Sequence, residues 1–288
     1  MPERRVTLIG AAALIVAATV GMFVVGGGVQ GQKMQEIKFD LGKNIVETAR
    51  ASGVPQFQTR DVVGFISYSV VGVPKEIPAR YTRPGYEIVW RPIFAFTMYA
   101  DRDRDASIPV QSVSLSLNSD ITSHESAQAF VEQTIAQFAR GKWQRYFEPE
   151  WDVLLTGRSS LLDESGQINN TLMTIDPAYK IAPAEWLQVV SGVAIWRWVG
   201  DGVLASLTVG NRPGADGKPD YSMELEFELL DIKLRRDAEN LARDLEQGDA
   251  KGWNSTAKHE AAKREAKERN KRLVANALER GDTVVSLP

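Results

Sequence analysis

Nine residues late in the chain alternate between apolar and polar side chains without an exception, from Tyr221 to Leu229. Successive residues of a strand point to opposite faces of a sheet, so this order predicts one buried face and one solvated face. The apolar set consists of Tyr221, Met223, Leu225, Phe227 and Leu229, and the polar set of Ser222, Glu224, Glu226 and Glu228. A strand of this kind belongs in an antiparallel sheet that is packed on one side, which restricts the fold more than any other feature of the chain.

Other segments predict further strands for such a sheet. Two runs rich in β-branched and aromatic residues flank Gly200-Asp201-Gly202, a pattern typical of a β-hairpin. Pro92 interrupts a third run, and a proline inside a strand indicates an edge, a bulge or a break. The expected strand segments are Val62 to Gly72, Glu87 to Ala100, Ser112 to Asn118, Val193 to Val199 and Val203 to Val209. Short consecutive strands favour a mainly antiparallel α+β fold.

One amphipathic helix is expected to pack against this sheet. Thr122 and Glu125 have the spacing of a capping box, and Gly141 matches a C-terminal stop. The stripe at i, i+3 and i+4 spacing consists of Ala127, Phe130, Val131, Thr134, Ile135 and Phe138. Shorter helices are predicted near Asn44 to Ala51 and over Pro183 to Val190, where proline suits the first helical turn.

The last fifth of the chain predicts a charged helical hairpin. A first helix over Lys233 to Gln247 carries a leucine stripe, Gly248 breaks it, and a second helix runs to about Arg280. Residues 233–282 hold 13 Lys and Arg against 10 Asp and Glu, a net charge of +3. The net charge of the whole chain is −3, so the residues before this segment have a net charge of −6. This asymmetry points to the hairpin as the place where a partner binds.

The N-terminal region contains 24 residues without a charge, from Val6 to Val29. As a helix they would reach about 36 Å, which exceeds the roughly 30 Å of a hydrocarbon core. Arg4 and Arg5 precede the stretch, so the positive-inside rule predicts a cytoplasmic N-terminus and a periplasmic C-terminal domain. The expectation is a single-pass protein of the bacterial inner membrane; the alternative is a cleaved signal peptide.

Small residues at four-residue spacing, Ala13, Ala17 and Gly21, are compatible with a dimer through this helix, although such residues are common in membrane helices anyway. The predicted organisation is a cytoplasmic tip and transmembrane anchor over residues 1–29 and a stalk over 30–60. An α+β periplasmic domain follows over 61–232, and a charged helical hairpin with its tail over 233–288.

Composition excludes several kinds of chemistry. The chain has no Cys, which excludes disulfide scaffolds, thiolate catalysis and Cys-ligated zinc. Two His residues are too few for a multi-histidine metal site, and 34 Lys and Arg against 37 Asp and Glu create no global field for nucleic acid. We therefore expect no cofactor, no metal and no nucleic-acid partner.

Motifs of known catalysis are incomplete in this sequence. Asp101, Asp103 and Asp105 alternate as in a calcium loop, but Ala106 stands where that loop needs glycine. His124 lacks the second histidine of a metalloprotease helix, and neither a nucleophile elbow nor a phosphate-binding loop is present. The chain is thus expected not to be an enzyme. A hydrolase of the cell envelope that uses carboxylates stays an alternative, because carboxylate pairs are assembled in space.

Two sets of residues are candidates for binding a partner. Trp196 and Trp198 share one face of a strand, where they either line a groove for a ligand or cell-wall polymer, or pack in the core. The second set is cationic and lies on the last helix: Lys258, Lys263, Arg264, Lys267, Arg269, Lys271 and Arg272. It is either a solvated face with internal salt bridges or a basic surface for an acidic partner, an anionic lipid or a cell-wall polymer.

Three stretches, Gly141 to Gly166, Trp196 to Leu207 and Ala238 to Glu265, are similar to a group of single-pass envelope proteins of Gram-negative bacteria. They include GKWQRYFEPEW, WRWVGDGVLASL and AENLARDLEQGDAKGW. That group is associated with type VI secretion effector and immunity neighbourhoods, and the resemblance covers roughly the second half of the chain. It implies a periplasmic, non-enzymatic protein that binds a toxin or a secretion component, as an immunity or accessory protein. It implies no particular site residues.

Overall fold

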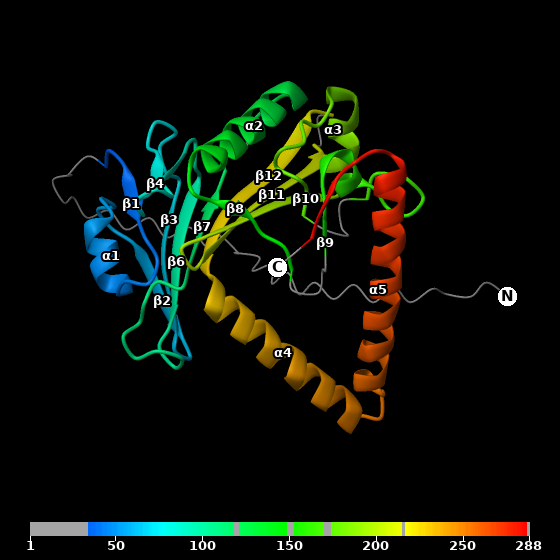
Figure 1. Cartoon of the computed structure of the whole chain (residues 1–288). Helices are drawn as coiled ribbons and strands as arrows, with labels where there is room; N and C mark the ends of the chain where they lie inside the picture. Colours follow the sequence, from blue (N-terminus) through cyan, green and yellow to red (C-terminus); the bar gives the residue numbers. More distant parts are fainter. Residues whose placement is uncertain (1–33, 118–120, 149–152, 170–173, 215–216, 287–288) are drawn as a thin grey trace. The chain divides into compact units, whose positions relative to one another are not determined.

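An eight-stranded antiparallel sheet forms the body of the protein (Figure 1). The computed structural model describes residues 34–117, 121–148, 153–169, 174–214 and 217–286. Across the sheet the strands follow in the order β2 (Gln58–Val62), β3 (Phe65–Val71), β6 (Ala95–Asp101), β7 (Ser112–Ser116), β12 (Pro219–Leu229), β11 (Val203–Pro213), β10 (Val193–Gly200) and β8 (Gln144–Arg145). Every neighbouring pair is antiparallel, as the sequence predicts.

The alternation on β12 has the expected structural result. Tyr221, Met223, Leu225 and Phe227 are buried, whereas Glu224 and Glu226 are exposed on the opposite face. Glu228 departs from the pattern because it is buried, and its carboxylate is paired with a cation from the following helix. The sheet therefore has one packed face and one polar face.

Helices α2 (His124–Arg140) and α3 (Pro183–Val190) pack against the apolar face (Figure 1). The predicted stripe of α2 enters the core, where Phe138 stacks on Trp198 with ring centroids 3.9 Å apart. The N-terminal cap of α2 differs from the prediction. Ser123 rather than Thr122 caps the helix, because its side chain bonds the third helical residue, Ser126, which bonds back.

A smaller sheet and a short helix are formed by the first part of the described chain, interrupted by β2 and β3 of the main sheet. They comprise β1 (Ile37–Phe39), α1 (Ile45–Ala51), β4 (Ala79–Tyr81) and β5 (Ile88–Trp90). Ile37 and Phe39 are buried in the core, so the predicted stalk is wrong for this part of residues 30–60. Pro92 separates β5 from β6, which belong to different sheets, as its break of the strand pattern indicated. Gln137 of α2 bonds both backbone groups of Val89 and so covers the open edge of β5.

The C-terminal helical hairpin is also present. Strand β12 passes directly into α4 (Leu230–Ala250), and α5 (Ser255–Glu279) leads back to β13 (Val284–Ser286). Strand β13 pairs with β9 (Val153–Leu155), which precedes the single-turn helix η1 (Gly157–Leu161). The chain end is thus attached to the body through a two-stranded sheet.

The membrane prediction requires a correction. Within the described part of the chain, no helix combines the length and the apolar composition that crossing a bilayer requires. The predicted fold class is therefore wrong in its transmembrane helix, and so is the single-pass inner-membrane location that rested on it. The stretch Val6 to Val29, and the dimer ridge within it, lie outside the described residues.

Candidate functional site

The α4–α5 hairpin is attached to the body at both of its ends. At the base of α4, Arg236 forms a salt bridge of 2.6 Å with Glu228 of β12. Farther along the helix, Glu239 accepts a bond of 2.6 Å from Arg104, which lies in the loop after β6. These contacts position the first half of α4 against the edge of the body.

The end of α5 is held by a polar cluster around η1. The Asp282 carboxylate accepts bonds from the backbone N–H and the hydroxyl of Ser159, at 3.1 and 2.5 Å. Arg280 donates to the same hydroxyl at 2.8 Å, and Leu273 and Ala277 pack against the body in a small apolar cluster of their own. Because Ser159 is fully buried and engaged by both partners, we assign it a structural role rather than that of a nucleophile.

A tight turn connects the two helices at the far end of the hairpin. Gly248 of α4 lies against Ser255 of α5 so closely that a side chain at position 248 would collide with the serine hydroxyl. Asp249 accepts bonds from the backbone and side chain of Thr256, while Trp253 is exposed. From this turn the two helices diverge, as Figure 1 shows.

An apolar stripe on α4 is left without a partner by this divergence. Leu234 and Leu241 are 39% and 42% exposed, although an amphipathic helix normally buries such residues. On a helical wheel, the stripe lies on the side of α4 that carries Gly248, the residue that meets α5. The leucines therefore point toward the inner side of the hairpin, where α5 no longer covers them.

The predicted cationic residues of α5 divide into two groups. Lys258, Lys263, Arg264 and Lys267 are exposed and form no salt bridge within the described residues.

The other three are constrained by their surroundings. Lys271 pairs with Glu268 at 2.6 Å, and Arg272 with Glu164 of the body at 2.5 Å. Arg269 is half-buried, and its Nε atom has no hydrogen-bond partner in the part of the chain that the structure describes. Among the described residues, salt bridges of the predicted cationic set therefore involve only its C-terminal part.

The structure places the predicted tryptophans away from any surface site. Trp196 and Trp198 are buried, since their positions on β10 face the packed side of the sheet. In register, Trp198 lies opposite Ala205, which lies opposite Phe227 of the buried set. Neither indole can line a groove for a ligand or a partner, and that part of the site prediction is corrected to core packing.

A row of glutamates on the polar face was not singled out from the sequence. Glu224, Glu226 and Glu228 follow each other on one side of β12, at the base of α4. Although the Glu226 side chain reaches solvent, desolvation of its carboxyl by the surrounding atoms, reinforced by repulsion from the other two carboxylates, raises its pKa to about 7. Glu224 accepts a bond from Ser114 and Glu228 pairs with α4, whereas Glu226 has no bonded partner among the described residues.

The sequence contained one signal for this site, the strict alternation that puts all three carboxylates on one face. The crowding that perturbs only the middle one depends on neighbouring strands and on α4. Within the described residues, no group of three or more His, Asp or Glu side chains is arranged to hold a metal ion.

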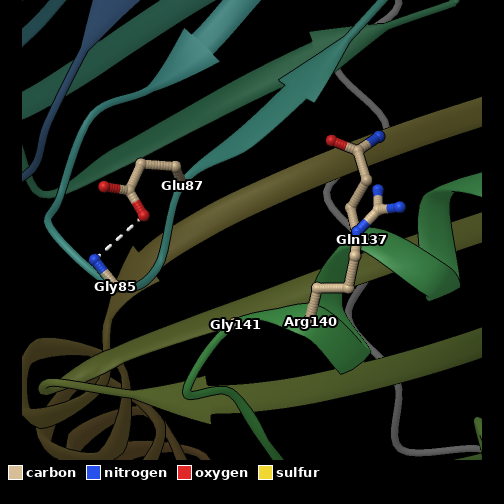
Figure 2. A pocket seen from close by; sticks show the side chains of 5 residues that line it. All are labelled: Gly85, Glu87, Gln137, Arg140 and Gly141. Atoms are coloured by element: carbon tan, nitrogen blue, oxygen red, sulfur yellow. Dashed lines mark hydrogen bonds between the residues drawn. The ribbon is translucent and has the colours of Figure 1, made fainter.

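A small hollow lies at the end of α2, away from the hairpin. Figure 2 shows the residues that line its volume of about 230 Å³: Gly85, Glu87, Gln137, Arg140 and Gly141. Glu87 accepts a hydrogen bond from the N–H of Gly85 at 2.9 Å, and Gln137 accepts one from the backbone N–H of Val89. Its two charged side chains, Glu87 and Arg140, are both exposed, so the hollow offers no desolvated group for chemistry.

Comparison with known proteins adds no relative: no protein-family model, no curated protein and no solved structure matches this chain.

Proposed function

We propose that this protein is a protein-binding module that receives an amphipathic helix of its partner on the inner side of the α4–α5 hairpin. The observation that carries the proposal is the unpartnered leucine stripe of α4, represented by Leu234 and Leu241. Two helices of a closed hairpin would cover each other's stripes, but here the stripe faces a helix that diverges from it. An apolar helix face of this kind is what a helix-in-groove interaction uses.

The positive charges of α5 predict which residues lie on the polar side of the partner helix. Of the α5 cations that form no salt bridge among the described residues, Lys258 and Lys263 lie on the same side of the helix as Ser255, the residue that meets α4, and they would meet acidic side chains. Such rim contacts mainly accelerate association and exclude wrong partners, while the buried leucines provide most of the affinity. The partner is therefore a protein with an acidic amphipathic helix.

The resemblance to proteins from type VI secretion neighbourhoods narrows the choice of partner. We propose a toxin, which the module would neutralise, or a component of a secretion assembly. Toxin neutralisation predicts that co-expression of this chain rescues cells from a toxin encoded beside its gene.

The direct test is a titration of the purified full chain against the product of each neighbouring gene. Replacing both leucines by glutamate, Leu234→Glu with Leu241→Glu, should weaken binding at least 100-fold, because two charges would enter an apolar interface. Leu187→Glu is the matched control, since Leu187 is similarly exposed but lies on α3. Unchanged affinity of the double variant, with the fold intact by circular dichroism, would refute the proposal.

A second candidate function has one specific observation in its favour. A carboxyl group whose pKa is raised to about 7, as in Glu226, can act as a general acid or base near neutral pH. A hydrolase of this kind should release soluble fragments from labelled peptidoglycan, and Glu226→Gln should abolish the release. Absence of release by the wild-type chain between pH 5 and 8 would rule this function out for that substrate.

A further inference from the structure

The β2–β3 hairpin ends in a turn that holds a β-branched residue in a disfavoured backbone conformation. Two residues, Val63 and Gly64, connect the strands, and their φ angles are 49° and 79°. Two positive φ angles are the mark of a type I′ turn, whose first position favours Asn, Asp or Gly. Valine is strained there, and strain of this kind is characteristic of functional sites.

The same turn presents apolar side chains to solvent. Val63 is 89% exposed, and the flanking Val62 and Phe65 are 64% and 48% exposed. We call these three residues the β2–β3 tip. Turn chemistry alone would favour a polar residue in place of Val63, so neither local conformation nor burial explains its presence.

The tip is held rigidly by its neighbours. Asp61 accepts the N–H of Gly64 at 3.2 Å and is also paired with Arg102. The backbone N–H of Arg102 donates to the carbonyl of Gly64 at 2.9 Å. Phe65 stacks on Tyr99, with ring centroids 5.4 Å apart. A rigid apolar protrusion loses little conformational entropy when it docks.

Two charged side chains near the tip form no salt bridge among the described residues, Asp103 and the exposed Arg60 of β2. The carboxylate of Asp103 lies against Gly64, where an added Cβ would be 2.6 Å from it. Within the described residues this carboxylate accepts no hydrogen bond and forms no salt bridge, whereas the nearby Arg102 is already paired. A cationic group of a partner protein, placed at the rim of its pocket, would therefore complete the environment of Asp103.

We propose that the β2–β3 tip is a second docking element, which inserts Val62, Val63 and Phe65 into an apolar pocket of a partner protein whose rim carries Lys or Arg. The element is independent of the α4–α5 hairpin, because it lies on other strands and uses other residues. It accounts for the strained valine, since an aliphatic side chain at the apex fills a pocket that the favoured polar residues would not.

The experiment starts from Val63→Asn in the full chain. Asn tolerates the left-handed conformation, so the variant should melt at a higher temperature than the wild type, which shows that Val63 is strained. A photoreactive benzoylphenylalanine at position 63 then captures the contacting protein in the native host. The same group at Val193, which is also exposed but lies on β10, is the control.

The captured protein is purified and titrated against the wild-type chain and three variants. Val63→Asn and the pair Val62→Ser with Phe65→Ser should each weaken binding at least tenfold, and Asp103→Lys should weaken it and reverse its dependence on salt.

Four results would overturn the proposal: no capture specific to position 63, full affinity of Val63→Asn, full affinity of the Val62→Ser and Phe65→Ser pair, or flotation of the wild-type chain with anionic phosphatidylglycerol vesicles in a tip-dependent manner. The last result would identify the tip as a lipid-binding element instead.

Discussion

Replacing Glu226 by Gln is expected to stabilise the protein at alkaline pH and to leave its stability unchanged in acid. Glu226 lies on β12 between Glu224 and Glu228, and burial of its carboxyl is the main cause of its raised pKa of about 7. Repulsion by the two flanking carboxylates adds to the effect, while Arg236 and Arg197 oppose it. Gln keeps the shape of the side chain and removes the charge.

The direction of the pH dependence follows from the two states. The carboxyl titrates near 4.5 in the unfolded chain and near 7 in the folded protein, so the folded state binds the proton more tightly. Its contribution to stability is therefore complete below about pH 4.5 and is lost as the pH rises through 7. At pH 8 the wild-type fold contains an ionised Glu226 that it does not accommodate well.

The pKa difference sets an upper limit on the stability gained by Glu226→Gln, and solvent screening lowers the value that we expect. A difference between 4.5 and about 7 corresponds to at most about 3–4 kcal/mol, at about 1.4 kcal/mol for each tenfold change in proton affinity. Because the side chain also touches water, screening reduces the expected gain of Glu226→Gln at pH 8 to about 1 kcal/mol. At pH 4.5 the expected gain is close to zero.

Urea unfolding followed by tryptophan fluorescence at pH 4.5 and pH 8 measures both values. Glu246→Gln on the exposed side of α4 is the control for the general effect of removing one negative charge. If Glu226→Gln stabilised the fold equally at both pH values, or destabilised it at pH 8, the reasoning from desolvation and repulsion would be wrong.

Three further substitutions test the packing and the turns. Phe138→Ala removes the ring stacked on Trp198 and should lower the free energy of unfolding by about 3–5 kcal/mol in urea titrations; a loss below about 1 kcal/mol would contradict the burial of this pair. Gly248→Ala should lower the thermal midpoint and expose the α4–α5 turn to proteases, because the methyl group collides with the hydroxyl of Ser255, and adding Ser255→Gly should restore both. Asn44→Ala removes the acceptor at the N-terminus of α1 and should cost about 1 kcal/mol in thermal melts, whereas an unchanged midpoint would show that this cap contributes nothing.

Elements with a strong local period were predictable from the sequence. The alternation from Tyr221 to Leu229 anticipated β12 and its buried face, and the stripe containing Phe138 anticipated α2. The hairpin at Asp201 and the helix over Pro183–Val190 were equally clear. In each case the signal lies within a few residues, because side-chain direction repeats with the period of the element itself.

Contacts between distant segments were not predictable. The pairing of β1 with β4 joins Ile37 to Ala79 in parallel, and no local pattern marks it, so a segment expected as a stalk turned out to be core. The tryptophans of β10 share a face, as expected, but that face is buried only because Phe138 of α2 and the strands beside β10 cover it. The predicted single-pass membrane protein is contradicted as well, because no helix in the described part of the chain is long and apolar enough to cross a bilayer.

The candidate site shows the same division. By itself the sequence determined the leucine stripe of α4 and the cationic residues of α5, since both depend only on helical spacing. Only the tertiary structure decided that α5 diverges from Leu234 and Leu241 and that Arg272 forms a salt bridge with the body. It also decided that the Glu226 carboxyl is desolvated and repelled by the two flanking carboxylates. Periodicity defines which side chains share a face, but exposure and proton affinity depend on what packs against that face, which is a property of the folded chain.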